Sequence, residues 1–219
     1  MEKKIALGML LFSILVLIVA ILLPGGRTVE GEPLLPWKIE LKSDGATQVF
    51  GLTLGRSTVE EARQRFHQDG AISLFRNPQG KMSLEVYFDR VFLSGLRGDY
   101  VLRVAVAEAE LQNLYDRGVR ISQLGNGSNK VELSSRDQEW VYQQPIEVIT
   151  YIPMTRLDEA LIEERFGPPA EKITEEKSGV VHWLYPEQGL DLGRDPRGRS
   201  VLQYIHPAEF ARLTAPFTP

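Results

Sequence analysis

The 219-residue sequence contains no cysteine. This absence excludes disulfide bonds, a thiol nucleophile, thiolate metal ligands and the acylated cysteine of a lipoprotein. Histidine is scarce as well, and His67, His182 and His206 have no partner at metal-ligand spacing, so we expect no metal site. No tract of Lys and Arg occurs, and the net charge is −4. Because nucleic-acid binding needs a basic surface, nucleic acid is not expected as a partner.

Motifs that carry chemistry are also missing. The sequence has no phosphate-cradling glycine loop and no Gly-x-Ser-x-Gly nucleophile elbow. Asp191 and Asp195 are close in sequence, but residues 195–198 read Asp-Pro-Arg-Gly, which is typical of a type I turn. The sequence therefore predicts no enzyme, no catalytic residues and no cofactor. A hydrolase that uses Asp191, Asp195 or His182 remains an alternative.

One long apolar run, residues 5–23, contains no charged residue. Its length of about 19 residues matches the roughly 20 that a helix needs to cross a bilayer, and it exceeds the apolar core of a cleaved signal peptide. The run predicts an uncleaved signal anchor in a bacterial inner membrane. Lys3 and Lys4 favour a cytoplasmic tail of residues 1–4 and a periplasmic domain. A buried helix of a soluble protein and a cytoplasmic domain are the alternatives.

The remaining residues have a globular composition, and Pro and Gly are concentrated in residues 24–36, which predicts a stalk. Ser57 and Glu60 have the spacing of a capping box, which predicts a helix start. Alternating apolar residues then predict an antiparallel meander up to residue 106, and a second helix follows over residues 107–117. Residues 37–118 are expected to form one small α+β domain.

A similar order of elements is expected in residues 146–219. A strand over residues 147–152 precedes a helix that Thr155 and Asp158 cap and that Gly167 ends, and short strands and a closing helix follow. Because the order is similar, we predict an internal duplication, with residues 119–145 as the connector. The predicted fold class is α+β: a single N-terminal transmembrane helix followed by two related small domains, each with helices packed on an antiparallel meander sheet.

Two segments suggest a family. Residues 52–66, LTLGRSTVEEARQRF, and residues 164–171, ERFGPPAE, resemble the SmpA/OmlA/BamE-like proteins. The resemblance implies small periplasmic ααβββ domains, an arrangement shared with a β-lactamase inhibitor protein. It also implies a binding or scaffolding role without catalytic residues. The chain departs from the family in lacking the acylated cysteine, and residues 67–70 of the first copy read HQDG where the family pattern has Gly-x-Pro.

The sequence thus predicts a non-catalytic, membrane-anchored periplasmic accessory or assembly subunit that binds a larger inner-membrane or envelope complex. Arg194, Arg197 and Arg199 surround the predicted turn, where they could contact an acidic partner or a lipid phosphate. The alternative is a protein that binds a lipid or a small apolar ligand between its two domains.

Overall fold

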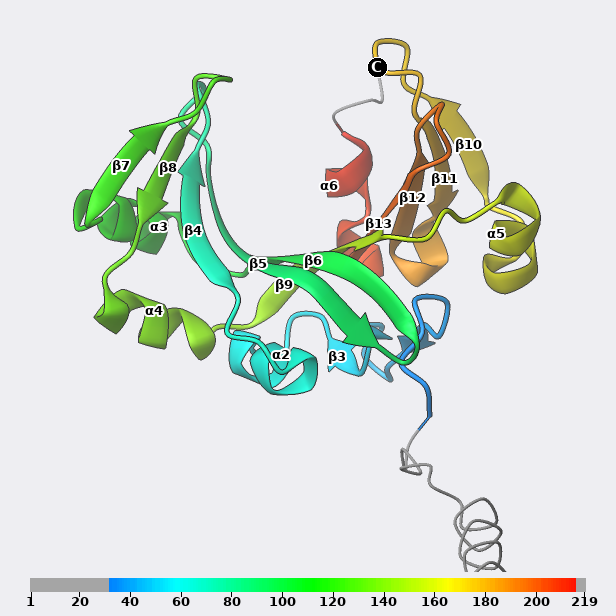
Figure 1. Ribbon diagram of the computed structural model, residues 1–219, viewed down its shortest axis with the longest axis horizontal. Helices are drawn as coiled ribbons and strands as arrows, with labels where there is room; N and C mark the ends of the chain where they lie inside the picture. The colour runs from blue at the N-terminus through cyan, green and yellow to red at the C-terminus, as the bar shows by residue number, and fades with distance from the viewer. Residues whose placement is uncertain (1–31, 216–219) are drawn as a thin grey trace, which may run out of the picture. The chain divides into compact units, whose positions relative to one another are not determined.

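The computed structural model describes residues 32–215. Ten strands of this part form one antiparallel sheet in the order β10-β11-β12-β13-β9-β6-β5-β4-β8-β7, and β1, β2 and β3 form a separate small sheet (Figure 1). The strands are β1 Glu40–Leu41, β2 Thr47–Val49, β3 Leu52–Thr53, β4 Ala71–Arg76, β5 Met82–Leu93, β6 Leu96–Val104, β7 Arg120–Gln123, β8 Asn129–Glu132, β9 Ile146–Pro153, β10 Glu171–Thr174, β11 Val181–Tyr185, β12 Leu190–Arg194 and β13 Ser200–Ile205. The α-helices are α2 Val59–Phe66, α3 Glu108–Asp116, α4 Ser135–Tyr142, α5 Glu159–Phe166 and α6 Ala211–Thr214, with 3-10 turns η1 Pro186–Gln188 and η2 Pro207–Glu209.

The helices begin at polar capping residues. The hydroxyl of Thr58 accepts the backbone N–H of Glu61 at the start of α2, and the carboxylate of Asp158 accepts the backbone N–H of Leu161 at the start of α5. Thr155 and Asp158 were predicted together as the cap of α5, and only Asp158 caps it. The cap of α2 is Thr58 rather than Ser57. Ser57 instead accepts the backbone N–H of Thr53, 3.1 Å away, and so stabilises the turn before the helix.

The two halves of the chain meet in the middle of the sheet. Strands β6 and β9 pair from Gly98↔Pro153 to Val104↔Ile146, and β9 pairs on its other side with β13. One continuous set of buried side chains includes residues of both halves. The predicted α+β fold of two domains, each with its own sheet, is therefore wrong, because strands from both halves share one sheet and one core.

The predicted membrane span is also corrected. Within residues 32–215, no helix is long and apolar enough to cross a bilayer. The finding overturns the predicted localisation as a single-pass inner-membrane protein, whereas the membrane as a partner stays a prediction. The run at residues 5–23 that suggested the anchor lies outside the described residues.

Alternation along the strands divides the sheet into two faces. In β6, Tyr100, Leu102 and Val104 are buried, whereas Val101 and Arg103 between them are only half-buried. Figure 1 shows α2 and α4 against one side of the sheet, and α6 on the other, inner side, where the sheet curves up into two arms. One face thus carries the main core. On the inner face, α6 covers a smaller buried cluster that includes Val148, Leu184 and Ile205, and the rest of that face is left open.

An aromatic cluster lies at the centre of the core. The ring of Phe50 lies 5.1 Å from that of Tyr100, 5.3 Å from that of Tyr151 and 5.7 Å from that of Tyr204. Tyr204 is fully buried, and its hydroxyl donates to the backbone oxygen of Pro36 over 2.8 Å. The end of the predicted stalk is therefore held against the fold. Phe50 itself has a φ of 53°, an uncommon value for a bulky residue.

We expect Phe50→Ala to lower the free energy of unfolding by about 3–5 kcal/mol, because it leaves a cavity among three aromatic rings. Phe92→Ala is the matched control, since Phe92 is 67% exposed and should change stability by no more than about 0.5 kcal/mol. Urea unfolding of both variants measures the difference. Equal losses would show that the Phe50 cluster does not hold the two halves together.

Stability should also fall at high pH. Burial raises the pKa of Tyr151 and of Tyr185 to about 12, and burial raises that of Tyr204 well above its ordinary value. These phenols ionise near pH 10 in the unfolded chain. Their contribution to the free energy of unfolding is therefore complete below about pH 10 and is lost as pH rises toward about 12. Unfolding free energies measured across this window check the prediction. Tyr151→Phe with Tyr185→Phe should flatten the slope, and an unchanged slope would contradict the assignment.

Candidate protein-binding face

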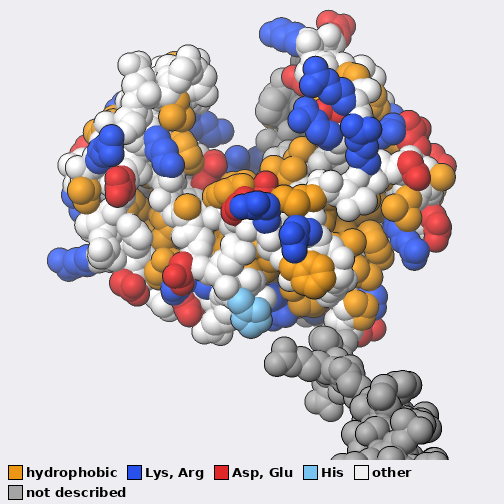
Figure 2. Space-filling model, in the orientation of Figure 1, with side chains coloured by type: hydrophobic (Ala, Val, Ile, Leu, Met, Phe, Trp, Pro, Cys, Tyr) orange, Lys and Arg blue, Asp and Glu red, His pale blue; other side chains and the backbone are white. Residues whose placement is uncertain are grey.

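The inner face of the sheet, here called the open face, presents a row of side chains across five strands. Tyr87, Val101, Thr150, Gln203 and Asp191 are cross-strand neighbours in β5, β6, β9, β13 and β12. They point away from the core because the residues on either side of them in the strands pack into it. Figure 2 shows a hollow between the two arms of the sheet, above this region.

Exposed apolar side chains gather at one end of the open face. Phe92 at the end of β5 is 67% exposed, Met154 just after β9 is 50% exposed, and Val201 of β13 is 37% exposed. Met154 is joined to β6 by a hydrogen bond from its backbone N–H to the oxygen of Arg97, and Ile152 pairs with Asp99 of β6. These four residues, Ile152, Phe92, Met154 and Val201, are called the apolar patch below. Large exposed side chains of this kind commonly mark interaction sites.

Two arginines lie beside the apolar patch. The guanidinium carbon of Arg97 lies 5.9 Å from the centre of the Phe92 ring, and Arg156 lines the groove next to Met154. Within residues 32–215, neither guanidinium forms an ion pair with a carboxylate. Figure 2 shows Lys and Arg side chains gathered on the arm that carries β12 and β13, beside hydrophobic side chains at the centre. The patch therefore has cations available for an acidic ligand.

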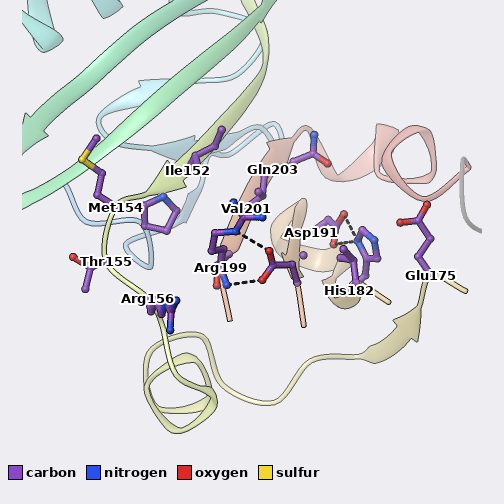
Figure 3. A pocket seen from close by; sticks show the side chains of 15 residues that line it. Ile152, Met154, Thr155, Arg156, Glu175, His182, Asp191, Arg199, Val201 and Gln203 are labelled. Carbon is purple, nitrogen blue, oxygen red and sulfur yellow. Dashed lines mark hydrogen bonds and ion pairs between the residues drawn. The ribbon is translucent and has the colours of Figure 1, made fainter. Parts of the chain in front are cut away.

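A groove of about 780 Å³ runs from the apolar patch across β13 and β12 (Figure 3). Its walls combine apolar, polar and charged side chains, among them Ile152, Met154, Thr155, Arg156, Glu175, His182, Asp191, Arg199, Val201 and Gln203. A second groove, of about 880 Å³, lies further along the open face and is lined in part by Glu85, Arg103, Glu147 and Arg212. Both grooves are open to solvent along the sheet.

His182 and Asp191 form the floor of the first groove. Asp191 is only 1% exposed, and both of its carboxylate oxygens lie within 3.0 Å of Nδ1 of His182 on the neighbouring strand. Gly193 lies opposite His182, and a Cβ there would be in ordinary van der Waals contact with the imidazole, 3.6 Å from its Cε1. A buried carboxylate is costly without a hydrogen-bond donor, so the pair stabilises this part of the sheet. It can also hold the imidazole in one orientation.

The three predicted contact arginines lie on or beside the turn at residues 195–198, and two of them form ion pairs. Arg194 pairs with Glu159 of α5, away from the groove, whereas Arg199 donates from Nε to Asp195 over 2.8 Å at the groove edge. The backbone N–H groups of Arg197 and Arg199 also donate to Asp195. The guanidinium groups of Arg194 and Arg199 are thus paired with carboxylates of the chain, and contact of the three arginines with a partner stays a prediction.

The residues of the hydrolase alternative are only partly brought together. His182 and Asp191 are in contact, while Asp195 accepts hydrogen bonds within its own turn. In the described part of the chain, no group of three or more His, Asp or Glu side chains could hold a metal ion.

Sequence reasoning missed Arg97, Arg156, Phe92 and Met154. A usable signal was present at Phe92, because the run Val91–Leu93 is apolar throughout and so places an apolar side chain at an outward position of a strand with one buried face. Arg97 and Arg156 carried no such signal, since turns and loops are rich in charged residues. Their neighbours are set by the pairing of β6 with β9, which connects positions far apart in sequence.

Comparison of the chain with known protein families, with curated proteins and with solved structures finds no match. The resemblance to the SmpA/OmlA/BamE-like proteins therefore stays a prediction.

We expect His182→Leu to lower the free energy of unfolding by about 2–3 kcal/mol, because it leaves the buried carboxylate of Asp191 without its donor. The double variant His182→Leu/Asp191→Leu should regain most of this loss, since it removes the charge as well. Arg199→Leu breaks an exposed ion pair at the same groove and should cost much less. Urea unfolding compares them. A double variant less stable than His182→Leu would contradict the pairing.

Proposed function

We propose that this chain is a non-catalytic protein-binding module that holds a partner protein on the open face of its sheet. The observation that carries the proposal is the unequal use of the two sheet faces. One face is filled by the main hydrophobic core, whereas the other presents the apolar patch and two grooves to solvent.

The composition of the open face suits a protein partner. Interface hot spots are enriched in aromatic residues and arginine, and Phe92, Arg97 and Arg156 supply these types together. Phe92 and Arg97 stand on hydrogen-bonded strands, so little backbone entropy is lost there when a partner binds, whereas Arg156 lies in the loop after β9. We infer that the partner presents an apolar side chain to the patch and acidic side chains to Arg97 and Arg156.

A small apolar ligand is less well supported. The sequence suggested such a ligand between two domains, but the two halves share one sheet and leave no gap between separate sheets. The groove at the apolar patch is lined by Glu175, His182 and Arg199 as well as by apolar residues. Charged walls of this kind do not favour a lipid chain.

Site-specific photo-cross-linking in the native cell tests the proposal. With benzoylphenylalanine at position 201, in the apolar patch, we expect a discrete cross-linked protein. The same residue at position 140, where Trp140 lies on α4, is the control and should give no such product.

Charge-reversal variants test whether an arginine of the site binds the partner. Arg156→Glu should abolish the product from position 201, whereas Arg136→Glu on α4 should leave it unchanged. The proposal is wrong if positions 201 and 140 give the same products, or if Arg156→Glu and Arg136→Glu have equal effects.

A further inference from the structure

The ten-stranded sheet has two edges, which are formed by β7 and β10. Each edge strand is hydrogen-bonded to a neighbour on one side only, so the backbone groups on its outer side have no strand partner within residues 32–215. Figure 1 shows β7 at the far end of one arm, with its outer side away from β8. Such an edge can pair with another chain unless side chains protect it.

The edge at β10 is protected. It carries Glu171 and Lys172, and Pro168 and Pro169 come shortly before it. The Lys172 ammonium also lies 3.4 Å from the centre of the Trp183 ring, which keeps a charge on the strand. Charged residues and prolines are the usual means of preventing strand addition.

The edge at β7 has less of this protection, because Arg120 is the one charged residue of the strand. Val119, immediately before the strand, is 66% exposed, Ile121 within it is 51% exposed, and Leu124 just after it is 37% exposed. The strand is Arg-Ile-Ser-Gln, and it contains no proline, no glycine and no acidic residue. Ile121 is the cross-strand neighbour of the buried Val131 of β8. It therefore lies on the core face of the sheet, but in the edge strand, where its side chain is left half exposed.

We propose that β7 pairs in antiparallel fashion with β7 of a second copy of this chain, which joins two sheets across a two-fold axis. The pairing would satisfy the free backbone groups and cover the apolar side chains of both copies. It is separate from the open face and does not depend on the proposed function.

The sequence of β7 fits pairing with itself. A two-fold axis at Ser122 places Ile121 opposite Gln123 and Arg120 opposite Leu124 of the other copy. The two Ile121 side chains are then diagonal neighbours, which reach each other across about 7–8 Å. A two-fold interface needs this self-complementarity, because both copies contribute the same surface.

Repulsion between the Arg120 side chains favours the register with the axis at Ser122 over the register with the axis at Ile121. With the axis at Ser122, the two Arg120 residues lie four positions apart along the strands, or about 13 Å, beyond the screening length of about 8 Å. With the axis at Ile121, the two arginines would be diagonal neighbours at about 7–8 Å and would repel each other. A four-residue pairing predicts a weak dimer, with a Kd of about 1–100 μM.

The test is the oligomeric state of the full-length chain in mild detergent, measured by sedimentation equilibrium over a range of concentrations around the expected Kd. We expect a monomer–dimer equilibrium for the unchanged chain. Ile121→Lys should raise the Kd by at least about 10-fold, because it places a charge on the edge strand. Trp140→Lys is the control, because it also replaces an exposed apolar residue with lysine but lies on α4. It should leave the Kd unchanged.

Hydrogen exchange locates the contact. The backbone amides of residues 120–123 should become more protected as the concentration of the unchanged chain rises, and those of β10 should not. Because Ile121 is half exposed, the lysine variant should keep its fold, which circular dichroism checks. A chain that stays monomeric throughout, a dimer that Ile121→Lys does not weaken, or protection that is absent from β7 overturns the proposal.

Discussion

The pairing of β6 with β9 is the interaction on which the rest of this structure depends. It connects strands from the two halves of the chain over the register from Gly98↔Pro153 to Val104↔Ile146. The strands approach closely at Gly98, where a Cβ would stand 2.3 Å from the Tyr151 ring and 2.7 Å from the oxygen of Ile152. Any larger residue at position 98 would force this junction apart.

The pairing of the two halves determines which side chains lie on each face of the sheet. The aromatic rings of Phe50, Tyr100, Tyr151 and Tyr204 meet on one side of the junction, where the core excludes water. On the other side, the same strands present Phe92, Met154 and Val201 without a covering layer. The candidate binding face is thus a consequence of the core, because alternation along a strand sends every second side chain to the opposite face.

Local sequence patterns predicted many of the individual elements. The helix that became α5 and its end at Gly167 follow from short-range rules, as does the turn at residues 195–198. The strand order did not follow from such rules. Each half has a meander that could close on itself or join its neighbour, and local alternation is the same in both cases. The prediction of two separate sheets failed at this point.

The sequence by itself therefore determined which residues form strands and helices in much of the chain, since capping, turn chemistry and alternation act over a few residues. It also excluded thiol chemistry outright, because no cysteine is present. Only the tertiary structure decided that His182 lies against Asp191, that Met154 is hydrogen-bonded to Arg97, and that Arg156 lines the same groove as Met154. These neighbours come from different strands and loops, and their contact depends on strand order and register, which are set by the packing of a shared core rather than by any local pattern.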